Sequence, residues 1–226
     1  MPAALAVMTR STSDPRIKSR LAESVPLVDD RRELALAFLD DLIDRGQALP
    51  GVRVRVAVTP PLEGLRVDRP SLPADLFLPQ RGTSVAERQR HVFEDLAASG
   101  FGQVVLICGS VPDLPTDHLL RAFAALSESS AMAVVGPSES GACYLIGLTV
   151  ERGAVPDVFS GVRWDSPYAA EDFARVCEQG GRTVRRIDAW NDVASPSDLE
   201  SLTNRLRYAP DSARHTAAAL KTLKRL

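Results

Sequence analysis

Residues 103–109 read QVVLICG, an uninterrupted apolar run of strand length. A strand that is apolar at every position is typical of the centre of a parallel sheet, because helices cover both faces of such a sheet. The loop SVPDLP, residues 110–115, follows directly. This stretch therefore predicts a central strand whose carboxyl end is followed by a loop.

Further strand-like segments occur on both sides of this run. Residues 52–58, VRVRVAV, alternate valine with arginine or alanine, which is typical of a half-buried strand. Residues 182–188, RTVRRID, alternate in a similar way and favour an edge strand. The remaining apolar runs of strand length are residues 3–8, 132–137 and 143–150, with a weaker one at residues 75–80.

Helical patterns lie between these strands. In residues 31–46 apolar side chains recur at helical spacing from Leu34 to Leu42, and Gly46 favours a stop. Ser84 forms a capping box with Glu87 and predicts a second helix, and Thr116 predicts a third as its cap. Two more helices are predicted after Ser166-Pro167 and Ser195-Pro196, where a cap residue precedes a proline. The last predicted helix is basic and amphipathic and covers residues 211–226.

This alternation predicts an α/β sandwich with a mostly parallel sheet. The sequence contains no Gly/Ser-rich linker and no repeat, so we expect one domain over residues 1–210, followed by the helix over residues 211–226. Ligands of such sheets sit beyond the carboxyl ends of the strands. The loops after Met8, after Gly109 and around residues 138–142 should therefore converge on a site.

Composition excludes several functional classes. The chain has 226 residues, of which 45% are hydrophobic and 25% charged, and its formal net charge is −2. This balance gives no support for a nucleic-acid partner, and no apolar run approaches the roughly 20 residues that cross a bilayer. The N-terminal apolar stretch is too short for a secretory signal, and the three cysteines form no CxxC pair. We expect a cytoplasmic protein with reduced thiols.

Several common enzyme motifs are absent. The sequence has no GxGxxG, GxxxxGK[ST], HExxH or GxSxG pattern, so dinucleotide-binding, Walker-type, zinc-protease and hydrolase-elbow sites have no direct support. The three histidines, His91, His118 and His215, fall on predicted helices and are not site candidates.

A basic loop follows the first strand. Arg10, Arg16, Lys18 and Arg20 lie within eleven residues and would repel one another unless an anion neutralised them. A phosphate-binding loop is one interpretation of this cluster. A solvated loop whose charges only maintain solubility is the alternative.

Five segments of the chain resemble a known protein family. The segment ALAVMTRSTSDPRIKSRL, residues 4–21, resembles the opening of the bacterial selenium-domain-associated transferases, and Lys18 and Arg20 match a lysine and an arginine of that family. Four later segments resemble the family in the same order, namely GSVPDLP (109–115), GPSESGACYLIGL (136–148), FSGVRWDSP (159–167) and WNDVASPSDLESL (190–202).

This resemblance implies a GT-A-like fold of the nucleotide-diphospho-sugar transferases, a three-layer α/β/α sandwich with a mostly parallel mixed sheet. The distantly similar 2-phospholactate and phosphoenolpyruvate guanylyltransferases share that fold. The implied ligands are a nucleotide or nucleotide sugar and a small-molecule acceptor.

The chain departs from the family at three acidic positions. Ser110, Ser140 and Ala194 stand where the family pattern has aspartates. A divalent cation that bridges diphosphate oxygens needs carboxylates to offset its charge. We therefore predict no metal ligands, and Mg²⁺ or Mn²⁺ is disfavoured as a cofactor.

Three acidic residues remain near these positions as catalytic candidates, Asp113, Glu139 and Asp192. Asp113 could equally brace the turn of its loop, and Asp192 could anchor the end of the preceding strand.

Other residues are candidates for ligand contacts. Ser110, Ser140 and Gly141 join the four basic residues as candidates for nucleotide or phosphate binding. Trp164 and Trp190 are candidates for stacking on a base or sugar, with core packing as the alternative.

Three functional hypotheses follow. The first is a divergent glycosyltransferase-like transferase that binds a nucleotide-activated donor or a phosphorylated small molecule through Arg10, Lys18 and Arg20 without the usual metal. The second is a guanylyltransferase-like nucleotidyltransferase acting on a phosphorylated hydroxy acid. The third is an inactive pseudoenzyme that binds a nucleotide or a partner. The C-terminal helix could join two copies in a homo-oligomer.

Overall fold

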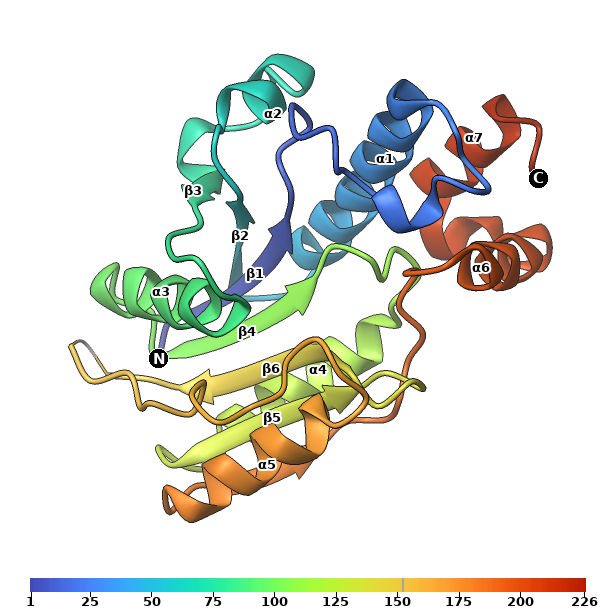
Figure 1. The fold of residues 1–226 in the computed structure, drawn as a ribbon. Helices are drawn as coiled ribbons and strands as arrows, with labels where there is room; N and C mark the ends of the chain where they lie inside the picture. The colour runs from blue at the N-terminus through green and yellow to red at the C-terminus, as the bar shows by residue number, and fades with distance from the viewer. Residues whose placement is uncertain (152) are drawn as a thin grey trace.

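The structure, a computed structural model, describes residues 1–151 and 153–226 and contains a seven-stranded sheet in the order β3-β2-β1-β4-β6-β5-β7 (Figure 1). The strand β6 runs antiparallel to its neighbours β4 and β5, and the other pairs are parallel. The strands are β1 (Ala3–Thr9), β2 (Val52–Val58), β3 (Phe77–Pro79), β4 (Gln103–Cys108), β5 (Met132–Pro137), β6 (Cys143–Thr149) and β7 (Thr183–Arg186).

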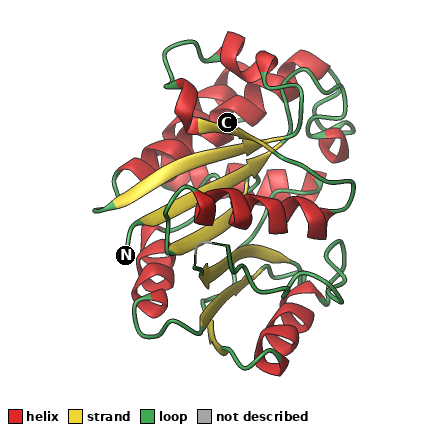
Figure 2. Ribbon diagram, turned by 90° about the vertical axis from the view of Figure 1, so that its left-hand side faces the viewer, coloured by secondary structure: helices red, strands yellow, loops and turns green. Residues whose placement is uncertain are grey.

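Helices cover both faces of this sheet, as Figures 1 and 2 show. The helices α1 (Val28–Gln47) and α4 (Thr116–Leu126) bury their apolar residues in a cluster on one face. The helices α3 (Val85–Ala98) and α5 (Ala169–Gln179) contribute to a separate cluster on the other face. The predicted three-layer α/β/α sandwich with a mostly parallel mixed sheet is therefore confirmed.

The apolar run that forms β4 lies in the middle of the sheet. Within β4, Val104, Val105 and Ile107 are at most 1% exposed, because β1 and β6 flank the strand and helices cover both faces. By contrast, β7 lies at the edge, where Arg185 and Arg186 reach carboxylates on neighbouring segments. The central strand and the edge strand are both as predicted.

The C-terminal helices pack against the outer side of α1. Residues of α6 (Pro196–Tyr208) and α7 (Arg214–Thr222) share a third buried cluster with α1. The carboxylate of Asp41 accepts hydrogen bonds from the backbone N–H and the hydroxyl of Thr216, at 2.9 and 2.7 Å. The helix predicted over residues 211–226 is shorter in the structure, where α7 spans residues 214–222. Its apolar residues pack largely against α1 of the same chain.

Two helices begin at the capping residues that the sequence indicates. Ser84 accepts a hydrogen bond from the backbone N–H of Glu87, whose carboxylate accepts one in return from the N–H of Ser84. Ser195 and Asp198 make the same reciprocal pair at the start of α6.

Two other helix starts differ from the prediction. Thr116 is the first residue of α4 rather than its cap, because Pro115 takes the capping position. Helix α5 covers the expected segment AAEDFARVCEQ, but Tyr168 rather than Ser166 takes the capping position. The hydroxyl of Ser166 donates to the carbonyl of Arg163 at 2.6 Å and so holds the preceding loop instead of the helix.

The segment after Pro60-Pro61 contains a short helix, α2 (Glu63–Asp68), whose Leu65 is buried against the face that α1 covers. Within the described ranges, no helix is both long enough and apolar enough to cross a membrane.

Candidate functional site

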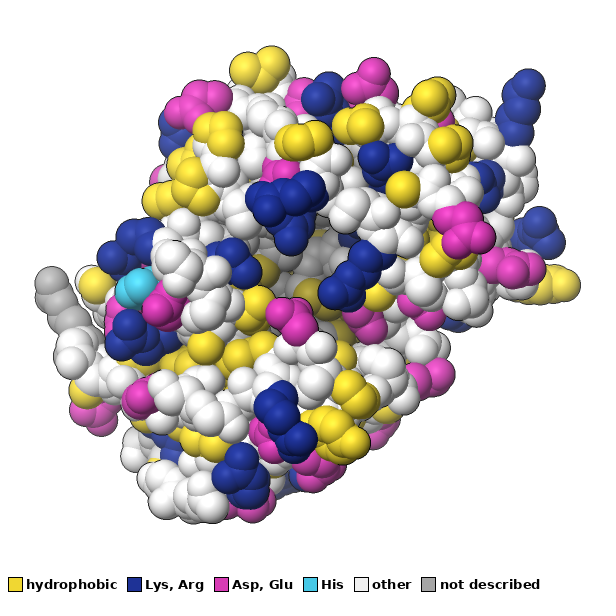
Figure 3. All heavy atoms as spheres, in the orientation of Figure 1, with side chains coloured by type: hydrophobic (Ala, Val, Ile, Leu, Met, Phe, Trp, Pro, Cys, Tyr) yellow, Lys and Arg dark blue, Asp and Glu magenta, His cyan; other side chains and the backbone are white. Residues whose placement is uncertain are grey.

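Two cavities adjoin where β1 and β4 end and β6 begins. The larger measures about 740 Å³ and the smaller about 360 Å³. Both open near the middle of the face in Figure 3, where basic side chains border a hollow. Residues that line both cavities include Met8, Arg20, Cys108, Ser110 and Asp192. The loops after Met8 and Gly109 and around residues 138–142 therefore converge as predicted.

The smaller cavity is lined by the basic loop. Arg10, Arg16, Lys18 and Arg20 all contribute to its wall, joined by Arg88 from α3. This concentration of positive charge favours an anionic ligand.

Two of these arginines already share a carboxylate. Asp14 lies within 3.3 Å of Arg10 and 3.0 Å of Arg16. The hydrogen bond from Arg16 lowers the pKa of Asp14 to about 2, so the carboxylate stays ionised at neutral pH and offsets part of the charge. The net positive charge of the loop is therefore carried mainly by Lys18 and Arg20.

Lys18 is held at the end of β4. Its Nζ atom donates to the carbonyl of Gly109 at 3.1 Å and to Oγ of Ser110 at 2.9 Å. The ammonium also lies 4.4 Å from the centre of the Phe38 ring. Burial lowers the pKa of Lys18 to about 8, an effect that the nearby carboxylate of Asp192 partly opposes.

The position of Lys18 depends on its backbone. The residue adopts φ 46°, in the left-handed region that a side chain other than glycine rarely takes. It is followed by the short 3₁₀ turn Ser19–Leu21, and Leu21 is buried against α1. This anchor holds Lys18 at the cavity and brings Arg20 to the boundary of the two cavities.

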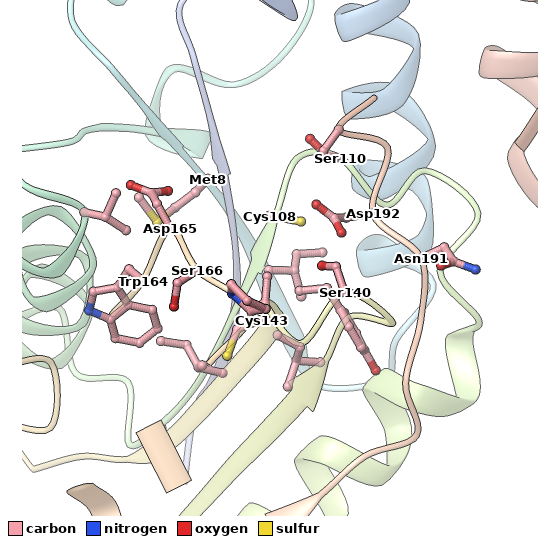
Figure 4. Close-up of a pocket in the computed structure, with 18 of the residues that line it drawn as sticks. Met8, Cys108, Ser110, Ser140, Cys143, Trp164, Asp165, Ser166, Asn191 and Asp192 are labelled. Carbon is pink, nitrogen blue, oxygen red and sulfur yellow. The ribbon is translucent and has the colours of Figure 1, made fainter. Parts of the chain in front are cut away.

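Apolar and acidic side chains both line the larger cavity. The apolar residues among them include Met8, Val85, Leu106, Cys143, Ile146 and Trp164. The carboxylates that line the cavity are Glu139, Asp165, Asp192 and Asp198. Figure 4 shows Asp165 and Asp192 standing apart, on either side of Cys108.

Asp192 is the most enclosed of the predicted catalytic residues in this cavity. Burial raises its pKa, and the negative charge of Asp198 adds to the rise. The basic side chains of Lys18 and Arg20 act in the opposite direction. A carboxylate in this setting can accept a proton more readily than an exposed one.

The loop between β5 and β6 brings two of the predicted residues to the larger cavity. Glu139 and Ser140 line it, and the hydroxyls of Ser138 and Ser140 lie 2.8 Å apart. Gly141 adopts φ 86°, and a Cβ atom there would overlap the carbonyl oxygen of Pro167. Gly141 therefore holds two loops together and does not itself line either cavity.

The two tryptophans have different positions. Trp164 lines the larger cavity, where its Nε1 donates to the carbonyl of Phe159 at 3.0 Å. Trp190 lies outside both cavities and packs edge-on against His118, with ring centres 5.5 Å apart. The packing interpretation therefore holds for Trp190.

Asp113 also lies outside both cavities. It is 5% exposed, accepts a hydrogen bond from Nε of Arg205 at 2.7 Å and is 3.4 Å from Nε1 of Trp190. These contacts join the loop after β4 to α6. We therefore remove Asp113 from the candidate catalytic residues, since its carboxylate is occupied by structural partners.

The thiols at the site are protonated at neutral pH. Cys108 and Cys143 line the larger cavity, and both are free. Burial raises the pKa of each to about 12.

Sequence reasoning missed Gln89. This residue lies one helical turn after Val85 on α3, so both face the larger cavity. Its Oε1 atom is buried without a hydrogen-bond partner. The i, i+4 spacing from an apolar residue could have indicated the face, but not the cavity that it meets.

Comparisons with known proteins give one family. The family described as "Uncharacterized protein conserved in bacteria (DUF2064)" matches residues 42–166, more than half of the chain. No curated protein matches the sequence.

Solved structures give the fold. A protein of Desulfovibrio desulfuricans G20, provisionally assigned as a nucleotide-diphospho-sugar transferase, matches with a TM-score of 0.85 and 24% identity, covering 98% of this chain and 94% of that one. A cytidylyltransferase of Leptospira borgpetersenii serovar Hardjo-bovis has a TM-score of 0.58 and 14% identity, with coverages of 99% and 94%. A CMP:2-keto-3-deoxy-manno-octonic acid synthetase in complex with CTP has a TM-score of 0.56 and 14% identity, with coverages of 92% and 99%.

Proposed function

The chain belongs to the DUF2064 family of bacterial proteins, and we propose that this member is a transferase that binds the diphosphate of a nucleotide-activated donor. It passes a glycosyl or nucleotidyl group to a small acceptor. The observation that carries this proposal is the pair of adjoining cavities, one basic and one large enough for a second substrate, with Arg20, Ser110 and Asp192 at their boundary. The cytidylyltransferases with the same fold add support.

The diphosphate is assigned to the basic cavity. Lys18 donates only to neutral oxygens, of Gly109 and Ser110, so its charge is available to an anion. Arg20 has no ion-pair partner among residues 1–151 and 153–226. Two cations at one boundary, neither of them in a direct ion pair, can stabilise the negative charge that develops on a departing diphosphate.

The residues present do not fit the divalent cation that relatives of this fold imply. Ser110 offers a hydroxyl where a carboxylate is needed, and the ammonium of Lys18 already lies 2.9 Å from it. The described ranges contain no group of three or more His, Cys, Asp or Glu side chains placed to hold a metal ion. We therefore assign charge stabilisation to Lys18 and Arg20.

The transfer step uses the larger cavity. The hydroxyl of the acceptor attacks the transferred group, and a new bond forms to the acceptor oxygen. The bond between that group and the diphosphate breaks, and its electron pair leaves with the diphosphate. The hydroxyl proton passes to the carboxylate of Asp192, which lines both cavities and whose raised pKa suits a general base.

Calorimetric titration with nucleoside triphosphates and nucleotide sugars tests this function. Each titration is run in EDTA and again with Mg²⁺ or Mn²⁺. We expect binding in EDTA to the wild-type protein, with affinity reduced on the order of 10- to 100-fold in a Lys18→Met variant, because a charged hydrogen bond is lost. Binding that strictly requires the metal would contradict the proposed charge stabilisation.

Turnover separates the three hypotheses. Release of a nucleoside diphosphate from a nucleotide sugar supports glycosyl transfer, and release of pyrophosphate from a triphosphate supports nucleotidyl transfer. With a phosphorylated hydroxy acid as acceptor, the second outcome identifies a guanylyltransferase-like activity. Binding of donors without release of either product across the acceptors tested would favour the pseudoenzyme and contradict the transferase.

A further inference from the structure

A buried arginine on α1 holds two distant points of the loop that carries Lys18. Arg31 is the fourth residue of α1 and is 6% exposed. Its Nε atom donates to the carbonyl of Ile17 at 3.3 Å. Its Nη1 atom donates to the carbonyls of Val25 and Pro26, at 2.8 and 2.7 Å. One guanidinium therefore joins the residue directly before Lys18 to the segment that enters α1.

The same face of α1 meets the smaller cavity. Ala35, one helical turn after Arg31, lines this cavity. Phe38, two turns after Arg31, has its ring centre 4.4 Å from Nζ of Lys18. Residues at i, i+4 and i+7 share one face of a helix. Arg31 thus lies on the face of α1 that supports the ammonium of Lys18, although it lines neither cavity itself.

Neither helix propensity nor charge pairing accounts for an arginine at this position. The dipole of a helix disfavours positive charge near the N-terminus. Arg31 takes part in none of the ion pairs that the structure describes over residues 1–151 and 153–226. A planar guanidinium presents several donors at fixed angles, which an ammonium does not. This geometry suits a group that holds two parts of a loop together.

The backbone of Lys18 needs such support. Its φ of 46° is unfavourable for a residue with a side chain, and a conformation of this kind persists only where the surrounding contacts hold it. Arg31 holds the carbonyl of Ile17 on one side, and Leu21 is buried on the other. A loop that is already ordered loses less conformational entropy when a ligand binds, so the ligand binds more tightly.

We propose that Arg31 is a positioning residue of the diphosphate site, whose guanidinium fixes the loop on both sides of Lys18 and Arg20 so that both cations line the cavity before a ligand binds. Arg31 acts through these residues and does not touch the ligand. The identity of the ligand as a diphosphate rests on the proposed function, whereas the placement of Lys18 can be measured without any ligand.

The first test follows the titration of Lys18 by NMR in protein labelled at its lysines. The chain has only three lysines, Lys18, Lys221 and Lys224, and a Lys18→Met variant identifies the signal of the first. The titratable groups that face its ammonium are Cys108 on β4 and Asp192 in the segment after β7. Both are retained in the variants that follow.

Removal of the guanidinium should raise the pH at which Lys18 titrates. Burial lowers the pKa of Lys18 to about 8. In Arg31→Met the loop is released and the ammonium reaches water, so the midpoint should rise by about one pH unit or more, toward the value of roughly 10.4 for an exposed lysine. An unchanged midpoint would overturn the proposal, as would a wild-type Lys18 that already titrates near 10.4.

A second variant separates position from charge and decides the question if Arg31→Met does not fold. Arg31→Lys keeps the positive charge, but one ammonium cannot hold both parts of the loop. We expect a rise of at least half a pH unit, and a wild-type midpoint would mean that Arg31 acts by charge alone. Arg182→Met is the control, because Arg182 also donates to a backbone carbonyl, that of Met132, and lines neither cavity. Its midpoint should equal that of the wild type.

Titration of pyrophosphate at pH 7.5 in EDTA then links the position of Lys18 to binding. Arg31→Lys should bind about tenfold less tightly than the wild type, and Arg182→Met should bind equally well. Lys18 is charged at this pH in the variant, so the loss reports its position and not its protonation. Equal affinities of Arg31→Lys and the wild type would overturn the proposal. If pyrophosphate does not bind the wild type, the proposed donor site is wrong, and the NMR titration alone decides whether Arg31 positions Lys18.

Discussion

The Nζ atom of Lys18 lies 2.9 Å from the Oγ atom of Ser110, and this contact ties the loop after β1 to the end of β4. The two residues are 92 positions apart in the chain. Their contact places a positive charge beside a hydroxyl at the position where the family resemblance expects a carboxylate. Anion binding at the site depends on this pair.

The first prediction concerns pH. Burial lowers the pKa of Lys18 to about 8, so the ammonium loses its proton as the pH rises through that value. A bound diphosphate needs the charged form, so the affinity for a nucleoside diphosphate such as CDP or ADP should be steady near pH 7.5 and fall by up to tenfold per unit above pH 8. Calorimetry from pH 7 to 9.5 measures this decline. A Lys18→Met variant should bind weakly and show no such decline, whereas a flat wild-type profile would contradict the role of Lys18.

The second prediction concerns Ser110. A Ser110→Asp variant would place a carboxylate next to Lys18 and neutralise the ammonium. We expect the affinity for pyrophosphate in EDTA to fall about tenfold, and the pH at which affinity declines to move upward, because a nearby negative charge raises the pKa of a lysine. Ser110→Asn, which is similar in size and uncharged, is the control and should bind more tightly than Ser110→Asp. Equal affinities for the two variants would count against direct action of Lys18 on the anion.

The third prediction separates Asp113 from Asp192. Asp113→Asn should lower the free energy of unfolding by about 2 kcal/mol, because Arg205 loses its carboxylate partner in a buried setting. Asp192→Asn should leave stability unchanged or raise it, since burial already penalises the charge of Asp192. Urea denaturation measures both.

Assays of nucleotide binding and of turnover test the same two carboxylates. Nucleotide affinity should survive in Asp113→Asn, and product release should be lost in Asp192→Asn. Loss of turnover in a stable Asp113→Asn protein would restore Asp113 to the catalytic residues.

The fourth prediction concerns the loop that borders the larger cavity. Gly141→Ala should cost about 3 kcal/mol of unfolding free energy, because the added Cβ overlaps the carbonyl oxygen of Pro167 and φ is 86°. Gly181 has a similar φ of 77° with nothing within 4 Å of the added atom, so Gly181→Ala should cost only about 1 kcal/mol. Thermal unfolding compares the two. Equal losses would mean that the contact between residues 141 and 167 is not needed.

Much of the fold could be predicted because its signals are local. The apolar run of β4 specifies a strand covered on both faces, and the capping boxes at Ser84 and Ser195 fix two helix starts within a few residues. Thr116 and Ser166 carry the same type of local signal, but neither residue occupies the N-cap position of its helix. Pro115 takes the capping position before α4, and Ser166 is used by the loop before α5.

The site could be predicted only in part. That the loops at the strand ends meet follows from parallel topology, which brought Lys18, Ser110 and Asp192 to one place. The role of Asp113 depends on its contact with Arg205, and that of Trp190 on its contact with His118. Both partners are distant in the chain, so no local sequence pattern indicates them.

The most direct test of the account is titration of pyrophosphate into the protein in EDTA at pH 7.5. The wild-type protein should bind it, and the Lys18→Met, Arg20→Ala double variant should bind at least 100-fold less tightly, because two charged contacts are removed. A matched variant with Arg185→Ala and Arg186→Ala, which removes two arginines from the edge strand β7, should bind as the wild type does. Binding that appears only when Mg²⁺ is added, or that survives the loss of Lys18 and Arg20, would contradict a diphosphate site built from these two side chains.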